Sequence, residues 1–288
     1  MSPSIPMLGV VGAGIMGAGI IEVGLRAGCT VIATDPYPSA RERASQEIAS
    51  RLAHAIQKGR LSGQVEEFLQ RLTWADDIDE FRSCTVVVEA IREVSAEKIE
   101  LFLALDDVVS AETILASNTS SIPIAQLARS TRHPERVIGM HFFNPAPSMP
   151  LVEVIPSLLT APAIAERTEV FVREVLGKQS IRAQDRAGFV VNAILVPYLL
   201  SAIRALQNGV ATAQDIDAGM VGGCNMPMGP LRLADLIGLD TLLLIATSMH
   251  AETLDPADTS PPLLRRYVDA GWLGRKSGRG FFDYASAH

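Results

Sequence analysis

The chain has 288 residues, of which 48% are hydrophobic and 20% charged, as in a folded globular protein rather than a disordered or collagen-like one. Its 25 basic and 32 acidic residues give a formal net charge of −7, and no stretch is strongly basic, which argues against nucleic acid or an anionic membrane as a partner. The longest apolar run, Phe189 to Ile203, is interrupted by Asn192 and Pro197 and is too short to span a bilayer.

The N-terminal sequence and the cysteines bear on the cellular compartment and on metal binding. The opening MSPSIPMLGVVG has no charged n-region, so the sequence predicts no secretory signal. Cys29, Cys84 and Cys224 lie far apart without a CxxC pair, which argues against a disulfide framework and against a structural metal site. We therefore expect a cytoplasmic protein that holds no metal.

The first half alternates short apolar runs with amphipathic stretches, the pattern of βαβ units around a parallel sheet. The predicted strands are Met7–Val11, Thr30–Thr34, Thr85–Glu89, Thr113–Ala116, Val137–Phe142 and Leu151–Ile155. The predicted helices are Ile15–Gly28, a long polar stretch from Ser39 to Leu72, Ser95–Val109 and Thr160–Leu176. In the last of these, Thr160 is expected to cap the start and Gly177 to end the helix.

The pattern changes after about Asp185, and from Gly188 onward no convincing strand is found. Helical runs are predicted at Phe189–Asn208, Thr212–Val221, Leu231–Met249 and Pro261–Ala270. The sequence thus predicts an α/β domain with a mostly parallel sheet over residues 1–185, followed by an all-helical domain over residues 186–288.

A glycine motif, G-x-G-x-x-G, follows the first predicted strand and opens a helix. Its members are Gly12, Gly14 and Gly17. The second glycine lets a pyrophosphate approach the backbone, and the third lets the helix pack closely on the sheet. The helix N-terminus adds free N–H groups and a partial positive charge. The motif therefore predicts a dinucleotide site.

An acidic residue, Asp35, ends the second predicted strand 18 residues after Gly17. A carboxylate there can accept hydrogen bonds from the adenosine ribose and repels a 2′-phosphate, which favours NAD over NADP. The alternative is that Asp35 is a turn residue before Pro36. Arg41 and Arg43 follow in the next helix, so NADP use stays open.

A histidine and a glutamate lie in two consecutive predicted strands. His141 is near the end of one and Glu153 is inside the next, with a proline-rich loop between them. An imidazole can accept a hydroxyl proton near neutral pH, and a carboxylate on its other nitrogen fixes the tautomer and stabilises the imidazolium. The alternative is a satisfied core histidine and a surface glutamate.

Polar residues in two further places remain ambiguous from the sequence alone. Ser117 to Ser121 (SNTSS) follow a strand-like run, where open α/β sheets bind substrates, but they also suit a helix cap, and for Ser121 the cap is favoured. Asn192 lies in an apolar run and needs hydrogen-bond partners. It is expected either to cap an internal turn or to face a cleft between the domains.

Seven blocks resemble, in order and spacing, the 3-hydroxyacyl-CoA dehydrogenases, and especially the stand-alone bacterial 3-hydroxybutyryl-CoA dehydrogenases. The blocks are GVVGAGIMGAGI, VVVEAIRE, ASNTSS, GMHFFNPAPSMPLVEVI, RAGFVVNAILVPYL, PMGPLRLADLIGLD and GRKSGRGFFDY. The resemblance covers residues 7–284 and implies a Rossmann-like NAD-binding domain, a helical domain that dimerises, and an acyl-CoA thioester substrate.

The resemblance also implies roles for individual residues. His141 matches the catalytic base, Glu153 its paired carboxylate, and Ser120 and Asn192 the groups that bind the reacting oxygen. Glu93 and Lys98 match cofactor-site residues, although a solvated helix start is the alternative. The implied cofactor contacts are Gly12, Gly14, Ile15, Met16, Gly17, Asp35, Glu93, Lys98, Asn118, Ser120 and Asn144.

Two positions depart from the family pattern: Ala193 stands where an arginine is usual, and Pro150 where many members have a lysine. The expected reaction is the NAD-dependent, reversible oxidation of a short-chain (3S)-hydroxyacyl-CoA to the 3-oxoacyl-CoA. The same chemistry on a carrier-protein-bound hydroxyacyl group or another hydroxyacid, and a non-catalytic NAD-binding protein, are the alternatives.

Overall fold

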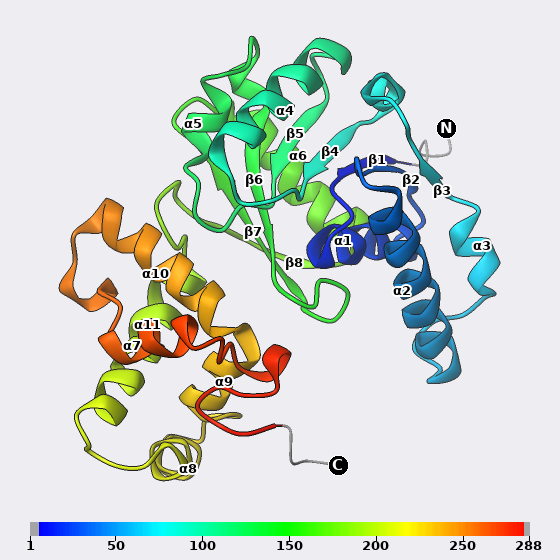
Figure 1. Cartoon of the computed structure of the whole chain (residues 1–288). Helices are drawn as coiled ribbons and strands as arrows, with labels where there is room; N and C mark the ends of the chain where they lie inside the picture. Colours follow the sequence, from blue (N-terminus) through cyan, green and yellow to red (C-terminus); the bar gives the residue numbers. More distant parts are fainter. Residues whose placement is uncertain (1–5, 285–288) are drawn as a thin grey trace. The chain divides into compact units, whose positions relative to one another are not determined.

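The computed structural model describes residues 6–284, and the chain divides into two compact units, Met1–Asp185 and Arg186–His288 (Figure 1). The first unit holds one eight-stranded sheet, and the second is built from helices. The predicted fold class, an α/β unit with a mostly parallel sheet followed by a helical unit, is confirmed.

The sheet has the strand order β3-β2-β1-β4-β5-β6-β7-β8. Its strands are β1 (Met7–Val11), β2 (Thr30–Thr34), β3 (Leu72–Trp74), β4 (Val86–Glu89), β5 (Ile114–Ser117), β6 (Val137–Phe142), β7 (Leu151–Pro156) and β8 (Gln179–Arg182). Strands β1 to β6 pair in parallel, β7 is antiparallel to β6, and β8 is parallel to β7. Strands β4 and β5 are buried along their whole length and are apolar except for their last residues, Glu89 and Ser117, as expected of strands covered on both faces.

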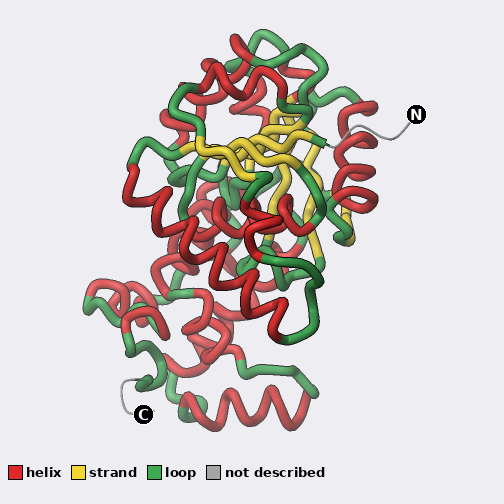
Figure 2. The backbone as a smooth tube through the Cα atoms, turned by 90° about the vertical axis from the view of Figure 1, so that its right-hand side faces the viewer, coloured by secondary structure: helices red, strands yellow, loops and turns green. Residues whose placement is uncertain are grey.

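Helices or 3₁₀ turns connect these strands, except that a loop joins β6 to β7 (Figure 2). They are α1 (Ile15–Arg26), α2 (Pro38–Gln57), α3 (Val65–Leu69), α4 (Ser95–Val108), α5 (Ile124–Ala128) and α6 (Pro162–Val170), with 3₁₀ turns at Ile78–Ser83 and Pro134–Arg136. The hydrophobic core between helices and sheet includes Ile20 from α1, Ile48 from α2, and Val31 and Met140 from the strands. Burial of these side chains is the main force that holds the helices on the sheet.

The polar stretch from Ser39 to Leu72, which the sequence predicted as helical, is interrupted. Gly59 and Gly63 take positive φ angles of 66° and 107°, a conformation that favours glycine and ends the helix between α2 and α3. Two strands were missed, β3 and β8. Both are short edge strands with partly exposed residues, so they lack the apolar run that marks the central strands.

The prediction that Thr160 caps the next helix is wrong. Helix α6 has Ala161 at its N-cap and Pro162 in its first turn. The Thr160 hydroxyl instead donates to the carbonyl oxygen of Val137 (2.6 Å) and accepts from Ser157 N (2.9 Å). The helix continues into a π-helical turn, Phe171–Val175, and Gly177 with a φ of 63° follows its end, as predicted.

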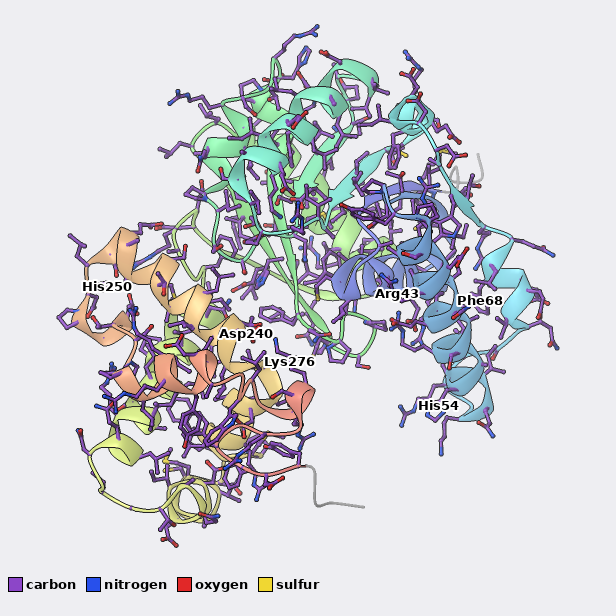
Figure 3. All side chains as sticks on the ribbon, in the orientation of Figure 1. Arg43, His54, Phe68, Asp240, His250 and Lys276 are labelled. Carbon is purple, nitrogen blue, oxygen red and sulfur yellow. The ribbon has the colours of Figure 1, made fainter. Side chains whose placement is uncertain are left out.

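The second unit comprises α7 (Val191–Gln207), α8 (Ala213–Cys224), α9 (Pro230–Ile237), α10 (Leu239–Thr253) and α11 (Pro262–Asp269), with 3₁₀ turns at Pro256–Asp258 and Arg275–Ser277. The predicted helix Leu231–Met249 is two helices, because Gly238 lies between them with a φ of 101°. Phe189 also has a positive φ, 48°, so α7 begins after it. Lys276 and Asp240 form an ion pair that attaches the 3₁₀ turn Arg275–Ser277 to α10 (Figure 3).

Two buried carboxylates organise the helical unit. Asp217 accepts hydrogen bonds from Leu231 N (2.8 Å) and Arg232 N (3.0 Å) at the start of α9. Asp235 accepts from Phe281 N, Phe282 N and the Tyr284 hydroxyl. Three hydrogen bonds to the Asp235 carboxylate therefore attach the segment 281–284 to α9.

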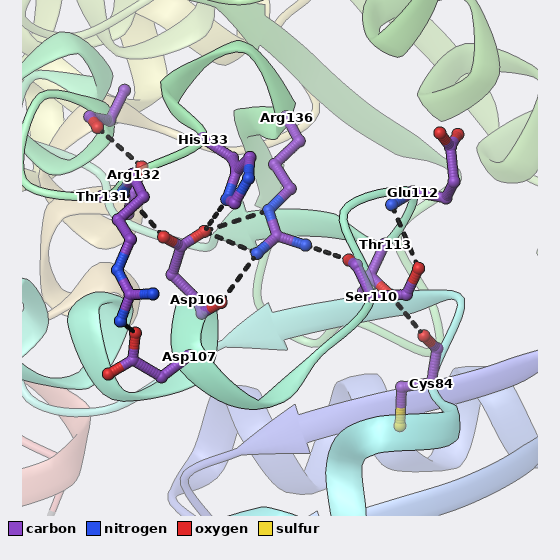
Figure 4. Close-up of polar contacts among 11 residues, drawn as sticks. Cys84, Asp106, Asp107, Ser110, Glu112, Thr113, Thr131, Arg132, His133 and Arg136 are labelled. Carbon is purple, nitrogen blue, oxygen red and sulfur yellow. Dashed lines mark hydrogen bonds and ion pairs between the residues drawn. The ribbon is translucent and has the colours of Figure 1, made fainter.

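A buried ion pair attaches α4 to the start of β6 (Figure 4). The Asp106 carboxylate accepts from the Arg136 guanidinium and from Arg132 N (2.7 Å), and His133 Nδ1 lies 3.3 Å away. Both charged side chains are 1% exposed. Burial raises the pKa of Asp106, but the hydrogen bonds and the charge of Arg136 outweigh it, so this pKa lies below its usual value.

We expect Asp106→Ala to lower the free energy of unfolding by about 3–5 kcal/mol, because it leaves the Arg136 charge buried without a partner. Asp107→Ala is the matched control: its exposed pair with Arg132 should contribute less than about 1 kcal/mol. Urea unfolding at pH 7 measures both. Since the folded-state pKa of Asp106 is depressed, its contribution should be present above about pH 4 and lost as the pH falls through the folded-state pKa. Equal effects of the two variants would contradict this assignment.

Candidate active site

The glycine loop connects β1 to α1, and its three glycines are needed for different reasons. Gly12 has a φ of 106°, and a Cβ there would lie 2.5 Å from the carbonyl oxygen of Ala90. A Cβ on Gly17 would lie 1.9 Å from the carbonyl oxygen of Gly12. Gly14 differs, because a Cβ there would meet no atom within 4 Å. The first and third glycines let the loop fold, whereas the second leaves open space beside the backbone.

Helix α1 begins at this open space. Gly14 is its N-cap and no side chain caps the helix. The first turn, which starts with Ile15, Met16 and Gly17, therefore presents backbone N–H groups and the positive end of the helix dipole. Such an end suits an anionic group such as a pyrophosphate.

Asp35 lies against the same loop. Its Oδ2 accepts a hydrogen bond from Ala13 N (2.8 Å), and its Oδ1 accepts from Tyr37 N (3.0 Å). Asp35 is thus a turn residue through Oδ1, as the alternative interpretation expected, and its Oδ2 also holds the glycine loop. A carboxylate has about four acceptor sites, so both oxygens retain capacity for ribose hydroxyls. The loop, the helix end and this carboxylate together fit a dinucleotide.

A buried charge network lies at the carboxyl ends of β4 and β5. Lys98, in α4, is 1% exposed, and its Nζ is 2.7 Å from Glu89 Oε1 and 3.0 Å from Glu93 Oε2. Glu89 is completely buried at the end of β4 and also accepts from the Ser117 hydroxyl (2.6 Å) and Ile91 N (2.7 Å). The alternative that Glu93 and Lys98 form a solvated helix start is therefore wrong.

Glu93 fixes the polar loop after β5. Its Oε1 accepts from the Thr119 hydroxyl (2.5 Å), Ser120 N (3.0 Å), Ser121 N (3.1 Å) and the Ser121 hydroxyl (2.8 Å). Burial raises the pKa of Glu93, but the Lys98 charge and the hydrogen bonds from Thr119, Lys98 and Ser121 outweigh it and lower the pKa below its usual value. Glu93 is thus a carboxylate that holds the backbone of Ser120.

Ser121 does not cap the next helix, which corrects the interpretation favoured from the sequence. The N-cap of α5 is Pro123, and no side chain of the N-cap bonds the helix. Instead, both oxygens of Asp185 accept hydrogen bonds from the first turn of α5, from Ile124 N and Ala125 N, each at 2.7 Å. The residue that caps α5 therefore lies about 60 residues later in the sequence.

His141 and Glu153 face each other across the antiparallel pair of β6 and β7, where they are direct register partners. His141 Nδ1 lies 2.7 Å from Glu153 Oε2, and both residues are buried. An ionised carboxylate can only accept a hydrogen bond, so this contact places a proton on Nδ1 and makes Nε2 the basic nitrogen. The ring also contacts Phe143 edge-on, with ring centroids 4.8 Å apart.

Asn118 and the loop after β6 complete this side of the site. Asn118 Oδ1 accepts from Phe142 N (2.8 Å), which attaches the end of β5 to the residue after His141. Asn144 is exposed and precedes a cis peptide bond to Pro145. The Lys178 ammonium donates to the carbonyl oxygens of Ala146 (2.8 Å) and Met149 (2.6 Å), so it holds this loop in place.

Asn192 belongs to the second unit, in the first turn of α7. The next residue, Ala193, lines a pocket of about 430 Å³ within that unit, together with Arg186, Met249 and Glu252.

Among the predicted site residues, the structure brings together two groups in the first unit. The cofactor group comprises the glycine loop and Asp35, and the second group links Glu93, Lys98, Asn118, Ser120, His141 and Glu153 through the ends of β4 to β7. Sequence reasoning missed Glu89 and Asp185. For Glu89 a signal existed, since a carboxylate at the end of an apolar strand requires a buried partner.

The described residues 6–284 show neither a metal cluster nor a membrane-spanning helix. In that range, no group of three or more His, Cys, Asp or Glu side chains is arranged to hold a metal ion. Every helix there is too short or too polar to cross a membrane.

We predict that Lys98→Met lowers the free energy of unfolding at pH 7 by about 3–5 kcal/mol, because Glu89 and Glu93 lose their buried cation. Without Lys98 the folded-state pKa of Glu93 should rise, so the variant should regain stability as the pH falls below 7, whereas the wild-type pair should lose stability on acidification. Urea unfolding between pH 4 and pH 8, with the exposed Lys58→Met as control, tests both statements. A loss of the same size at every pH would refute the role of the network.

Family models and full-length relatives match this chain. A family model described as "3-hydroxyacyl-CoA dehydrogenase, NAD binding domain" matches residues 7–186, and one described as "3-hydroxyacyl-CoA dehydrogenase, C-terminal domain" matches residues 188–284. The chain is 50% identical to 3-hydroxybutyryl-CoA dehydrogenase from Mycobacterium tuberculosis, with 99% of this chain and 100% of the relative covered. It is 42% identical to 3-hydroxybutyryl-CoA dehydrogenase from Bradyrhizobium diazoefficiens, with 100% and 98% covered.

Two solved structures share the fold over nearly the whole chain. FadB2 from M. tuberculosis superposes with a TM-score of 0.95 at 50% identity, covering 98% of this chain and 99% of that one. The (S)-3-hydroxybutyryl-CoA dehydrogenase of Ralstonia eutropha superposes with a TM-score of 0.93 at 40% identity, covering 98% and 100%. The resemblance found in the sequence is confirmed, and the chain belongs to the 3-hydroxyacyl-CoA dehydrogenase family.

Proposed function

We propose that this protein catalyses the reversible, NAD-dependent oxidation of a short-chain (3S)-hydroxyacyl-CoA, such as 3-hydroxybutyryl-CoA, to the 3-oxoacyl-CoA. Full-length relatives that carry the name 3-hydroxybutyryl-CoA dehydrogenase support the substrate class. The observation that carries the proposal is the buried contact of 2.7 Å between His141 and Glu153, because it joins a base to the carboxylate that orients it.

His141 acts as the general base in this proposal. Glu153 keeps the proton on Nδ1, so Nε2 takes the proton of the substrate's 3-hydroxyl group. The imidazolium that forms is stabilised by the adjacent buried carboxylate. NAD supplies the acceptor for the hydride that leaves the same carbon. In the reverse direction His141 returns the proton as a general acid.

Ser120 and Asn192 bind the substrate oxygen in this proposal. Ser120 suits this role because Glu93 holds its backbone and so limits where the hydroxyl can lie. The glycine loop, Asp35 and Asn144 bind the cofactor, with Gly12, Gly14, Ile15, Met16 and Gly17 at the pyrophosphate. Glu93, Lys98 and Asn118 line the part of the cofactor site that binds the nicotinamide. Lys98 acts indirectly, by holding Glu93, because its own ammonium is buried.

The two units take different tasks in this proposal: residues 1–185 bind NAD, and residues 186–288 bind substrate and form a homodimer. Apolar side chains on the surface of the helical unit support the dimer. They include Ile194, Val221, Leu236 and Leu244, which are 43–71% exposed. We place the protein in the cytoplasm, where acyl-CoA substrates and NAD occur together.

His141→Ala is expected to lower kcat/KM with acetoacetyl-CoA and NADH by about 10²–10⁴-fold or more, the usual contribution of a general base. NADH affinity should persist, because the glycine loop and Asp35 lie apart from the imidazole along the sheet. Absorbance of the reduced nicotinamide measures turnover, with NADH and NADPH in parallel and the exposed His54→Ala as the matched control. Turnover by His141→Ala at the wild-type rate would refute the assignment of the base.

Gly14→Ala tests the cofactor half of the proposal. An alanine fits the backbone here, since Gly14 has a φ of −70° and no atom lies within 4 Å of the added Cβ. The melting temperature should therefore stay unchanged, while the Kd for NADH rises at least about tenfold, equivalent to about 1.4 kcal/mol, because the methyl group occupies the space of the pyrophosphate. Gly219→Ala, also in open space, is the control for isothermal titration. Unchanged NADH affinity in Gly14→Ala would contradict the placement of the cofactor.

A second substrate class is the alternative to a CoA thioester, and one departure from the family pattern bears on it. Ala193 borders the pocket of about 430 Å³ in the helical unit, where an arginine side chain would occupy space. A hydroxyacyl group on a carrier protein, or another hydroxyacid, is therefore the alternative substrate. NADH oxidation with 3-oxoacyl groups on CoA and on a carrier protein, compared at equal concentration, separates the two.

A further inference from the structure

The side chain of Arg41 lies against the residue assigned to the adenosine ribose. Arg41 is in the first turns of α2, and its Nε donates to the backbone carbonyl oxygen of Asp35 (2.6 Å). Its Nη2 lies 3.4 Å from the Thr34 hydroxyl at the end of β2. With 18% of its side chain exposed, Arg41 is held close to Asp35.

The third contact of the Arg41 guanidinium is with a carboxylate. Arg41 Nη1 donates to Asp76 Oδ1 (2.6 Å), a residue just after β3 whose own side chain is 92% exposed. Asp76 N and Asp77 N both donate to Glu80 Oε1, so the loop that carries Asp76 is fixed. The guanidinium that contacts the backbone of Asp35 is thus already paired with a carboxylate.

Arg43, the other arginine in this part of α2, is labelled in Figure 3. It is exposed, and two residues along a helix correspond to a rotation of about 200°. It therefore faces away from the side of α2 on which Arg41 contacts Asp35. Among these two arginines, Arg41 is the one placed beside the ribose site.

We propose that Asp76 is a specificity-determining residue that favours NAD over NADP. A 2′-phosphate on the adenosine ribose is bound by an arginine in enzymes that use NADP, and Arg41 is placed for that contact. Asp76 holds Arg41 in an ion pair and adds a second negative charge near Asp35, so the cation is not available to the phosphate. The inference rests on the proposed position of the ribose at Asp35.

The test uses ADP-ribose and its 2′-phosphorylated form as probes, because neither carries a nicotinamide and their binding is independent of catalysis. Isothermal titration gives the Kd of each probe for the wild type, Asp35→Ser, Asp35→Ser/Asp76→Ala and Asp35→Ser/Asp76→Ala/Arg41→Gln. The Asp35→Ser background removes the carboxylate that repels the phosphate. Asp79→Ala in the same background is the matched control, since Asp79 is an exposed acid of the next 3₁₀ turn that pairs with Arg82.

Adding Asp76→Ala to Asp35→Ser should tighten binding of the 2′-phosphorylated probe by about fivefold, the size expected for one charge acting on a phosphate across partly hydrated space. The Kd for ADP-ribose should stay the same. The gain should shrink at high salt, disappear when Arg41→Gln is added, and not occur with Asp79→Ala.

Two results would overturn the inference: an unchanged ratio of the two Kd values on adding Asp76→Ala, or a gain that survives Arg41→Gln. The single variant Asp76→Ala, in which Asp35 is kept, repeats the comparison if Asp35→Ser binds neither probe. Failure of the wild type to bind ADP-ribose would refute the cofactor placement itself. Normal binding of ADP-ribose with no effect of Asp76 would refute only the role of Asp76.

Discussion

The site depends on one buried ammonium group. Lys98 lies between Glu89, at the end of β4, and Glu93, which holds the loop after β5, and all three side chains are largely removed from water. Burial of two carboxylates is strongly unfavourable unless a cation and further hydrogen bonds compensate their charge. Lys98 is the cation, and Ser117, Thr119 and Ser121 donate hydrogen bonds. Because a network of this kind has few satisfactory geometries, it fixes the loop backbone that carries Ser120.

Strand register provides the second constraint. His141 and Glu153 lie directly opposite each other in the antiparallel pair of β6 and β7. A shift by one residue would turn one side chain to the other face of the sheet and separate the pair. The register is maintained by the apolar neighbours Met140, Phe142, Val152 and Val154, all buried in the same core. Hydrophobic packing on both sides of the pair thus sets a contact of 2.7 Å between two polar groups.

Much of the first unit follows from local patterns. Met7–Val11, Thr30–Thr34 and Val137–Phe142 form strands with the predicted bounds, because buried parallel strands carry apolar runs. Edge strands β3 and β8 lack that signal. The burial of Lys98 and the cap that Asp185 gives to α5 were also not predictable, because each depends on which distant residues the sheet order brings together. Local sequence indicates which residues form a strand, but not which charges will share its end.

The cap from Asp185 fixes the point at which the chain leaves the first unit. Helix α5 follows directly on the loop that Glu93 holds, and Asp185, the last residue of the first unit, accepts the N–H groups of Ile124 and Ala125. The chain therefore leaves the sheet-containing unit from a point fixed to the loop that carries Ser120. A carboxylate at a helix N-terminus is stabilised both by hydrogen bonds and by the helix dipole. One charge network thus holds the loop that carries Ser120, and one helix cap attaches the helix after this loop to the point where the chain continues into the helical unit.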